Sequence, residues 1–516
     1  MKSIIKYFCS LAIAFVLTGC NDGFLDRLPS DQLADESFWK LENDAVQYTA
    51  ACYRYLIDPA AHLMMTDCFT DNGVPIHLYE AQGTLSSGTA TSTNTEFSGI
   101  WSTAYSGIRR CDVFFQNIEK VEMNENRKSI LVGEIEFLRA FHYATLLKHF
   151  GGVPILAEPL KLYETIPARN TAEEVYKFIL EECDKAALKL PVVRSEVSEI
   201  GRATKGAAMS LKAQISFFMQ DYKTTVIASK DVMELGVYKL FDDYSNLFSP
   251  DFENNCEVIF DRQYMENAIQ DGTGSMIDQY WGPQIIGGWE GLSPVQDLVD
   301  EFECTDGQPI STSPSYDPAS PYENRDPRLK ASILWHGREF GGFTYSTEGR
   351  IGKSNSTRTG YTYAKYINEK NIGMKDYGWT NFIYIRYADI LLMYAYAQNE
   401  LSGPDKTVYD AVNAIRQRPT VDLPPLISNL TKEQMREAIR HERRVEFVFE
   451  GIHFFDTRSW KTTEACVKKP VYGMDCTGEK FFIEQRKFDP NKDYVWAIPL
   501  TEIELSQGAL EQNPGW

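Results

Sequence analysis

The sequence predicts a mainly α-helical protein, with a scaffold of tetratricopeptide-like helix pairs capped by a large, irregular, loop-rich and aromatic-rich insert. Apolar residues recur at helical spacing over residues 41–240 and 386–460, in helix pairs of about 34 residues. The periodicity fades over residues 241–385, where Gly, Pro and aromatic residues become frequent. Of the 516 residues, 43% are hydrophobic and 24% are charged, so the chain can bury a large core and lacks the composition of a disordered protein.

The first helical part, residues 41–240, carries clear helix signals. Thr171 is placed as the N-cap of a helix whose apolar face includes Val175 and Ile179. The two helices that follow show apolar stripes at the spacing that one helix face requires. These stripes are Ala208, Leu211, Ile215 and Phe218 in one helix and Ala228, Val232 and Leu235 in the other.

The second helical part, residues 386–460, begins with two helices separated by a Gly-Pro turn at 403–404. Ala395, Ala414 and the terminating Pro419 match a tetratricopeptide unit, because small residues let two helices approach closely. The aromatic positions of such a unit are not matched, so an ordinary tight helical hairpin remains the alternative. Either arrangement is a scaffold with a curved surface and not a catalytic centre.

The insert, residues 241–385, is where we expect the ligand-binding surface. Four of the nine tryptophans fall within residues 281–379, among glycines, prolines and asparagines that favour loops. Aromatic faces exclude water and present a π-surface to the C–H groups of a sugar or to apolar side chains. The alternative is that these rings only pack the insert onto the helices.

The candidate ligand residues share one pattern, an aromatic ring or a polar side chain in a loop. Neighbouring amide and carboxylate groups can hydrogen-bond the hydroxyls or amides of a ligand that stacks on a ring. The candidates in the insert are Tyr280, Trp281, Trp289 and Tyr345, and those in an earlier polar-aromatic loop are Asp71, Asn72 and Tyr79.

The N-terminus has the features of an export signal. Lys2 and Lys6 give a positive n-region, and the largely apolar stretch over residues 4–17 has 14 residues, fewer than the about 20 that span a bilayer. The Leu-Thr-Gly-Cys sequence at residues 17–20 matches a bacterial lipobox, so we expect cleavage after residue 19 and a lipid on Cys20. An ordinary signal peptide followed by an incidental cysteine is the alternative.

This organisation predicts a signal over residues 1–19, a lipidated Cys20 with a tether over residues 20–40, and a single domain over residues 41–516. The domain ends in a C-terminal segment, residues 461–516. Eight further cysteines lack the spacing of metal ligands, and we expect most of them to be small buried apolar residues. A disulfide is permissible outside the cytoplasm, and Cys466/Cys476 is the closest pair in sequence.

Charge and motifs disfavour several functions. The formal net charge is −20, or −22 once Lys2 and Lys6 are removed, which argues against a nucleic-acid partner. The motifs of zinc proteases, phosphate loops, dinucleotide sites and serine hydrolases are incomplete or missing, so we expect no catalysis and no cofactor. Acidic loops near residues 297–300 and 306–307 could bind Ca²⁺, but neither contains a complete calcium-binding motif.

Eleven short motifs occur in order along the chain, each weak alone. They are CNDGFLD (20–26), WSTAYSGI (101–108), EIEFLRAFHY (134–143), FGGVP (150–154), GWEGLSP (288–294), NRDPR (324–328), IRYADI (385–390), RHERRVEF (440–447), EGIHFFD (450–456), IPL (498–500) and QNPGW (512–516). Together they make the chain resemble the SusD/RagB family of nutrient-binding outer-membrane lipoproteins of Bacteroidota.

The resemblance implies a surface-exposed, lipid-anchored protein that sits over a SusC-like TonB-dependent outer-membrane transporter and delivers a ligand to it. Family members bind oligosaccharides most often, and some bind peptides. The motif itself does not separate these two ligand classes. Two other hypotheses remain. One is a glycoside hydrolase with a carboxylate pair, and the other is a purely structural lid whose partner barrel recognises the ligand. Physically, the charges in residues 442–446 should be paired, with Asp456 and Arg458 as candidate partners.

Overall fold

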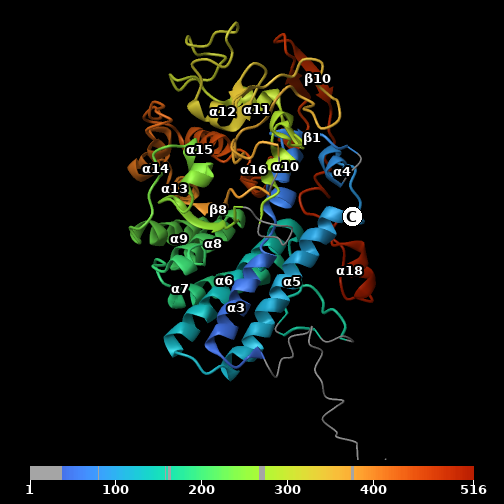
Figure 1. Cartoon of the computed structure of the whole chain (residues 1–516), viewed down its shortest axis with the longest axis vertical. Helices are drawn as coiled ribbons and strands as arrows, with labels where there is room; N and C mark the ends of the chain where they lie inside the picture. The colour runs from blue at the N-terminus through green and yellow to red at the C-terminus, as the bar shows by residue number, and fades with distance from the viewer. Residues whose placement is uncertain (1–37, 79–80, 157, 161–163, 267–273, 374–376) are drawn as a thin grey trace, which may run out of the picture.

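The structure is a computed structural model that describes residues 38–78, 81–156, 158–160, 164–266, 274–373 and 377–516. Helices dominate it, and the predicted fold class is confirmed (Figure 1). The α-helices are α3 (Glu42–Cys52), α4 (Ala81–Ser87), α5 (Thr95–Asn117), α6 (Glu125–Phe150), α7 (Ala172–Lys189), α8 (Lys205–Phe218), α9 (Tyr222–Glu234), α10 (Ile277–Trp281), α11 (Gln296–Glu301), α12 (Pro327–Ser332), α13 (Tyr387–Ser402), α14 (Lys406–Arg416), α15 (Lys432–Glu446), α16 (Ile452–Ser459), α17 (Thr463–Val467) and α18 (Leu500–Leu505).

The strands are short and pair two by two, always antiparallel, within the residues described. β1 (Gly73–Pro75) pairs with β3 (Leu292–Pro294), β2 (Val258–Arg262) with β8 (Phe382–Arg386), β4 (Ile333–Leu334) with β7 (Thr362–Tyr363), β5 (Glu339–Phe340) with β6 (Phe343–Thr344), and β9 (Val471–Met474) with β10 (Lys480–Glu484).

The helices begin where the sequence predicts caps. At α7 the Thr171 hydroxyl accepts a hydrogen bond from the Glu174 backbone N–H at 3.2 Å, and the Glu174 carboxylate accepts one from the Thr171 N–H at 2.8 Å. This reciprocal pair satisfies two of the donors that a helix start leaves unpaired. On α8, the small residues Ala207 and Ala208 are fully buried, which lets the neighbouring helices pack closely.

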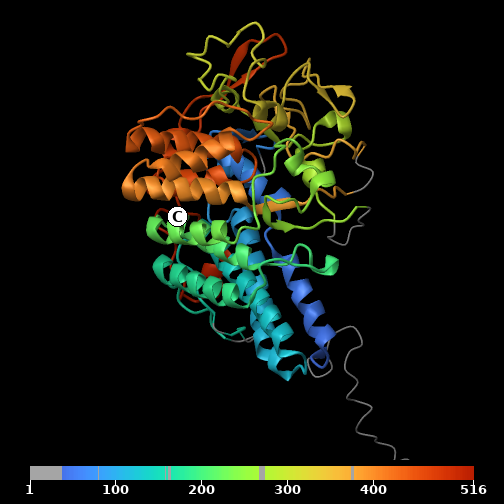
Figure 2. The same ribbon diagram turned by 90° about the vertical axis from the view of Figure 1, so that its left-hand side faces the viewer.

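Antiparallel helices stack one on another to form the scaffold (Figure 2). α7 packs on α6 and α8, α8 on α9, and α13 on α9, α14 and α15. The contact between α9 and α13 joins helices from opposite sides of the insert. The stack is therefore continuous in space although residues 241–385 interrupt it in sequence.

The insert is closed at its base by the β2–β8 pair, in which Val258 lies opposite Arg386. Because these strands lie near its two ends, the insert leaves the scaffold and returns to it at one place. Its remaining elements, α10 to α12 and β3 to β7, form the irregular cap at the upper end of the molecule in Figure 1.

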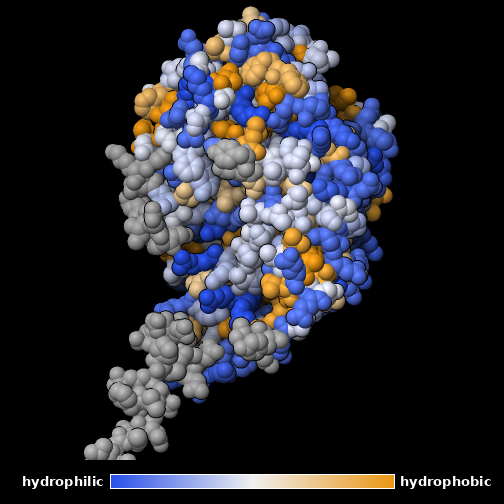
Figure 3. Space-filling model, turned by 90° about the vertical axis from the view of Figure 1, so that its right-hand side faces the viewer, coloured by the Kyte–Doolittle hydropathy of each residue, from blue (hydrophilic) through white to orange (hydrophobic). Residues whose placement is uncertain are grey.

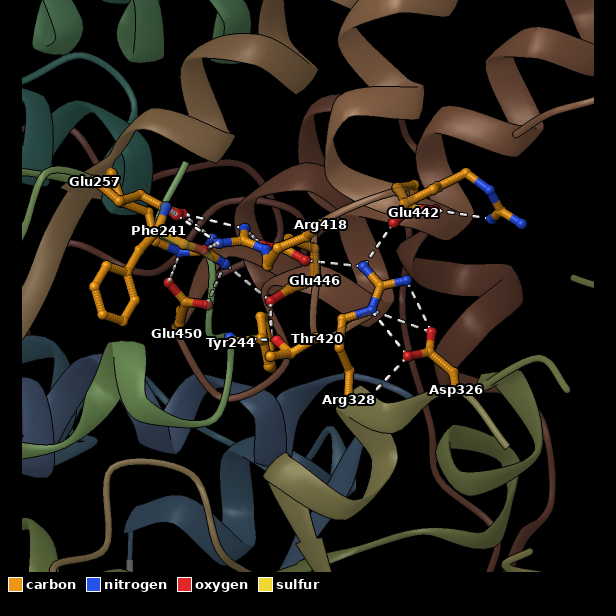
Figure 4. A network of polar contacts seen from close by, with 12 residues as sticks. Phe241, Tyr244, Glu257, Asp326, Arg328, Arg418, Thr420, Glu442, Glu446 and Glu450 are labelled. Atoms are coloured by element: carbon orange, nitrogen blue, oxygen red, sulfur yellow. Dashed lines mark hydrogen bonds and ion pairs between the residues drawn. The ribbon is translucent and has the colours of Figure 1, made fainter. Parts of the chain in front are cut away.

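A buried ion-pair network ties the insert to the scaffold, and Glu446 at the end of α15 is its centre (Figure 4). The Glu446 carboxylate accepts hydrogen bonds from Arg328 at 2.8 Å, Arg386 at 2.6 Å and Arg418 at 2.8 Å. Its partners come from α12 in the insert, the end of β8 and the segment after α14. The three arginines also form ion pairs with further buried carboxylates, which are Glu257, Asp326, Glu442 and Glu450.

The predicted pairing of the α15 charges is confirmed for Arg443, which contacts Asp456 at 2.7 Å and Asp389 at 2.9 Å. It is wrong for Arg458. That guanidinium lies 3.4 Å from the centre of the Phe454 ring, and burial lowers its pKa to about 9. Arg458 and Phe454 lie four residues apart on α16, so this contact is local to one helix and does not bring the guanidinium to the carboxylates of α15.

All eight cysteines in the described part of the chain are free thiols, and Cys52, Cys68, Cys111, Cys183 and Cys304 are buried. This agrees with their expected role as small apolar residues. None of the described helices combines the length and apolarity needed to cross a membrane. On the face shown in Figure 3, apolar residues gather in separate patches.

The substitution Glu446→Gln tests the network. Loss of the central carboxylate leaves three buried guanidinium groups without their shared partner, so we expect the free energy of unfolding to fall by about 3–5 kcal/mol in chemical denaturation. The matched control is Glu437→Gln on the same helix, because Glu437 is 69% exposed in its pair with Arg440 and should cost less than about 1 kcal/mol. Equal losses for the two variants would contradict the central role of Glu446.

The stability lost in Glu446→Gln should also depend on pH. Burial alone would raise the pKa of Glu446, but Arg418, Arg386 and Arg328 outweigh it and hold this pKa well below the usual range. Its stabilising contribution is therefore complete above the unfolded pKa of about 4.3 and is lost as the pH falls below that value. The difference in stability between the parent and Glu446→Gln should shrink in this acid range.

Candidate functional site

An exposed aromatic platform lies in the insert, formed by Tyr280 and Trp289. Their rings are stacked, with centroids 5.4 Å apart and planes 26° from parallel. Trp289 is 39% exposed, whereas Tyr280 is half-buried. Two of the predicted ligand residues are thus brought together at the surface. A flat, partly exposed pair of rings can stack against an apolar face of a ligand.

Backbone hydrogen bonds hold the two rings together. The Trp289 N–H donates to the Gln279 carbonyl and the Gly291 N–H to the Tyr280 carbonyl, each at 2.7 Å. The loop between them is tight, since a Cβ at Gly288 would lie 2.1 Å from the Gly282 carbonyl oxygen. Only glycine fits there, which explains the Gly-Trp-Glu-Gly sequence of residues 288–291.

Glu290 anchors this loop from below. Its φ of +49° is a left-handed conformation, which costs a residue with a side chain roughly 1–2 kcal/mol. The buried carboxylate accepts hydrogen bonds from the backbone N–H groups of Gln284 and Thr357, both at 2.8 Å, and from the Tyr345 hydroxyl at 3.2 Å. Burial raises the pKa of Glu290 although these groups oppose the rise, as does Arg350. The interior contacts of Glu290 therefore leave Trp289 facing outward.

Two other segments adjoin the platform loop. The Gly373 N–H donates to the Ile286 carbonyl at 2.8 Å, and a Cβ at Gly341, in the β5–β6 turn, would lie 3.5 Å from the Ile286 side chain. Each segment carries one apolar side chain that is more than 40% exposed. These are Phe343 at 43% and Ile372 at 44%.

The earlier polar-aromatic loop also reaches this region. β1 pairs with β3 directly after the platform loop, and the Ile76 N–H donates to the Gly291 carbonyl at 3.1 Å. The two segments predicted to bind ligand therefore lie side by side. Tyr79 itself, three residues after Ile76, lies outside the described residues, as does Cys20.

A second stacked pair in the insert joins Tyr322 and Trp335, with centroids 4.4 Å apart and planes 17° from parallel. The Arg338 guanidinium lies 5.2 Å from the Trp335 ring. Both rings are half-buried. Sequence reasoning missed Tyr322, because the separation of 13 positions between the partners corresponds to no regular spacing that could signal the contact.

Trp281 and Tyr345 are interior residues, so the expectation that they lie in an exposed loop is wrong. Trp281 is 5% exposed, and its indole N–H donates to the Ala60 carbonyl at 3.1 Å. Tyr345 is fully buried and donates to Glu290. The glycines that suggested an exposed loop serve close backbone packing around Trp281, since Gly291 lies against its ring.

Asp71 and Asn72 are also buried, so the expectation that they lie in an exposed polar loop is wrong as well. Asp71 accepts a hydrogen bond from His453 at 2.8 Å, and Asn72 accepts one from Arg444 at 2.9 Å. Burial opposes ionisation of Asp71, but Arg444 and His453 outweigh it and hold its pKa well below the usual range. These side chains fasten the segment before β1 to α15 and α16.

The acidic loops considered for calcium make internal contacts. Asp306 accepts hydrogen bonds from the Gln308 N–H at 3.1 Å and the Ser313 hydroxyl at 2.8 Å, and Asp300 accepts one from Gln296 at 2.7 Å. Within the described ranges, no group of three or more His, Cys, Asp or Glu side chains is placed to hold a metal ion. Calcium binding and the absence of any cofactor both stay predictions.

Comparison with known proteins assigns the chain to a family. Residues 256–516, just over half of the chain, match the sequence model of the SusD family. The chain belongs to the SusD family. Residues 24–217 match a second SusD-like model, described as starch-binding associating with outer membrane.

Other SusD-like proteins are similar to this chain over nearly their whole length. A SusD-like protein of Formosa agariphila is 27% identical over 92% of this chain and 94% of its own. The crystal structure of a SusD-like protein from Bacteroides fragilis is 31% identical, covers 95% of this chain and 100% of its own, and has a TM-score of 0.84. A SusD-like carbohydrate-binding protein of the same species is 28% identical, covers 92% and 99%, and has a TM-score of 0.85.

The substitution Glu290→Ala tests how this SusD-family chain holds its platform. The variant leaves two buried backbone N–H groups and a buried hydroxyl without their acceptor, so we expect a loss of about 2–3 kcal/mol in unfolding free energy. Hydrogen exchange should accelerate at Gln284 and Thr357 and not across the scaffold. Glu348→Ala, at an exposed position in the same insert, is the control and should leave both measurements unchanged. Unchanged protection of both amides in Glu290→Ala would contradict the anchor.

Proposed function

We propose that this protein is a cell-surface lipoprotein that binds oligosaccharides and delivers them to a partner TonB-dependent outer-membrane transporter. The observation that carries the proposal is the stacked, partly exposed Tyr280–Trp289 platform on a rigid loop of the cap. The proposed role is binding without catalysis, because the described residues of the platform present stacked rings to a ligand.

The platform suits a sugar ring for physical reasons. One face of a pyranose carries C–H groups, which pack against the π-face of an indole while the ring hydroxyls stay at the edge. Polar groups of the neighbouring segments can meet those hydroxyls, including Gln284, whose side chain accepts a hydrogen bond from Arg350 at 2.6 Å. Because the loop is held by buried contacts, little ordering is needed on binding.

The comparisons support this choice of ligand and location. A relative that is 28% identical is described as a carbohydrate-binding protein, and the second family model carries the description of starch binding and outer-membrane association. The lipobox ending at Cys20 supplies the means of attachment. A transporter partner follows from the family resemblance of the chain from residue 20 to residue 516.

The substitution Trp289→Ala tests the binding surface. Loss of the exposed indole removes the stacking face, so we expect affinity for the bound oligosaccharide to fall by about 1–2 kcal/mol, or roughly 5- to 30-fold in Kd, without a change in Tm. Isothermal calorimetry against a broad oligosaccharide panel measures it. Phe252→Ala is the matched control, because Phe252 is 42% exposed and packs with Phe241 in a separate cluster.

Trp281→Ala distinguishes a binding role from a packing role at the neighbouring tryptophan. Truncation of this buried side chain should lower the free energy of unfolding by about 3–5 kcal/mol.

If peptides give heat in the calorimetry and the whole oligosaccharide panel gives none, the ligand is a peptide and the glycan assignment is wrong. If Trp289→Ala leaves affinity unchanged, the platform is not the site.

The lipid anchor is tested by Cys20→Ser. We expect the variant to lose its membrane association and to take up no labelled palmitate, since the thiol that would carry the diacylglycerol is absent. Membrane fractionation of the expressing bacterium measures the association, and the label on the purified protein measures the incorporation of palmitate. Cys9→Ser, within the apolar part of the signal, is the control and should remain anchored. Retention of Cys20→Ser in the membrane fraction would contradict lipidation at this residue.

A further inference from the structure

A groove runs along the outer side of α5, away from the aromatic platform. It consists of two adjoining cavities of about 330 and 500 Å³ that share Ser106 and Arg109 on their walls. We call it the α5 groove. Its upper half is lined mainly by Trp101, Tyr105, Leu156, Leu160 and Ile166, and its lower half by Phe38, Trp39, Tyr48, Tyr55, Arg109, Arg110 and Val113.

The lower half of the groove is cationic, in a chain whose net charge is −20. Arg109 and Arg110 are both exposed there, and the described residues that line this half include no carboxylate. Arg110 is positioned by Tyr55, whose hydroxyl accepts a hydrogen bond at 3.2 Å and whose ring centre lies 5.5 Å away. Arg109 donates to the Leu160 carbonyl at 3.1 Å. Two guanidinium groups beside aromatic rings favour an acidic occupant with apolar side chains.

The upper half of the groove is apolar and contains an unused hydrogen-bond acceptor. Asp112 is 2% exposed and lies on the wall of this half. One of its carboxylate oxygens pairs with Arg139 at 3.1 Å, whereas the other has no hydrogen-bond partner among the described residues. Burial raises the pKa of Asp112 to about 6. A buried acceptor of this kind is usually satisfied, and the backbone N–H of an extended segment would satisfy it.

The chain itself supplies a segment of matching chemistry. Residues 21–37 contain five acidic residues and one basic residue, and they include apolar Phe24, Leu25, Leu28 and Leu33. They end immediately before Phe38, which lines the lower half of the groove. Asp35 and Glu36 precede Phe38 by three and two positions in the sequence.

The segment is also long enough. From Trp101 to Val113 the α5 helix rises roughly 18 Å, at about 1.5 Å per residue. About six residues of extended chain cover that length, at about 3.3 Å each. Seventeen residues precede Phe38 after Cys20. The family match that includes α5 begins at residue 24, so the shared pattern extends through this segment.

We propose that residues 21–37 of this chain dock along the α5 groove, with Asp35 and Glu36 against Arg109 and Arg110 and the leucines in the apolar half. The segment is then part of the folded domain and not a free spacer. Docking shortens the distance that the tether can span between Cys20 and the folded body. It also turns the α5 side of the molecule toward the anchor.

Cleavage after Arg27 by an arginine-specific protease tests this docking. The substrate is the chain from residue 20 onward with Cys20→Ser, and the reference is a synthetic peptide of residues 21–37. We expect cleavage of the Arg27–Leu28 bond to be at least about tenfold slower in the protein, because the protease acts on the undocked population. The double variant Arg109→Glu/Arg110→Glu should lose this protection without a change in Tm.

Three further variants separate docking from other causes. Asp35→Lys/Glu36→Lys should lose the protection as well, and combining it with the two arginine reversals should restore it, since the charges again match. Lys177→Glu/Lys223→Glu is the control for the arginine reversals. It makes the same change in net charge as they do, at exposed positions on α7 and α9, and should keep the parent's protection.

Several results would overturn the proposal. They are cleavage of the parent as fast as the free peptide, and equal protection in the parent and the arginine or acidic variants. Protection that appears only at high protein concentration would assign the groove to the segment of a second copy and would also overturn it. If the arginine variant folds poorly, the acidic variant decides alone, because its substitutions lie outside the described body.

Discussion

The rest of the structure depends on one constraint, the convergence of three guanidinium groups on the buried carboxylate of Glu446. Removing four charges from water is costly unless each finds its partner in good geometry. Arg328, Arg386 and Arg418 come from the insert, its closing strand and the scaffold. Because these arginines come from separate segments, their shared pairing with Glu446 favours the observed placement of the insert on the helices.

The position of the binding platform also depends on buried polar contacts. The insert is closed by β2 and β8 at its base, and Lys365 inside it contacts Glu450 at 2.6 Å. Higher in the cap, Glu290 repeats the same device on a smaller scale, since its buried carboxylate gathers donors from three separate segments. These buried contacts hold the aromatic surface in place although it lies on an irregular loop. That rigidity lowers the entropy lost when a ligand binds.

Sequence reasoning succeeded where the interactions are local. The cap at Thr171, the stripes of α8 and α9, and the turn between α13 and α14 all follow from contacts within a few residues. It failed where a residue's environment comes from distant parts of the chain. Trp281 and Trp289 stand in similar glycine-rich surroundings, yet one donates to the Ala60 carbonyl in the core and the other is exposed. Asn72 looks like a loop residue until Arg444, 372 positions later, is packed against it.

By itself, the sequence determined the helical scaffold, the interrupted order of its halves, and the family through motifs spread from Cys20 to Trp516. These features depend on periodicity, capping and composition, which act over short stretches and can be counted. Only the tertiary structure decided which aromatic residues face solvent, which carboxylates are paired, and that a groove lies along α5. Burial and ion pairing are properties of contacts between segments that are remote in sequence, and no local pattern contains them.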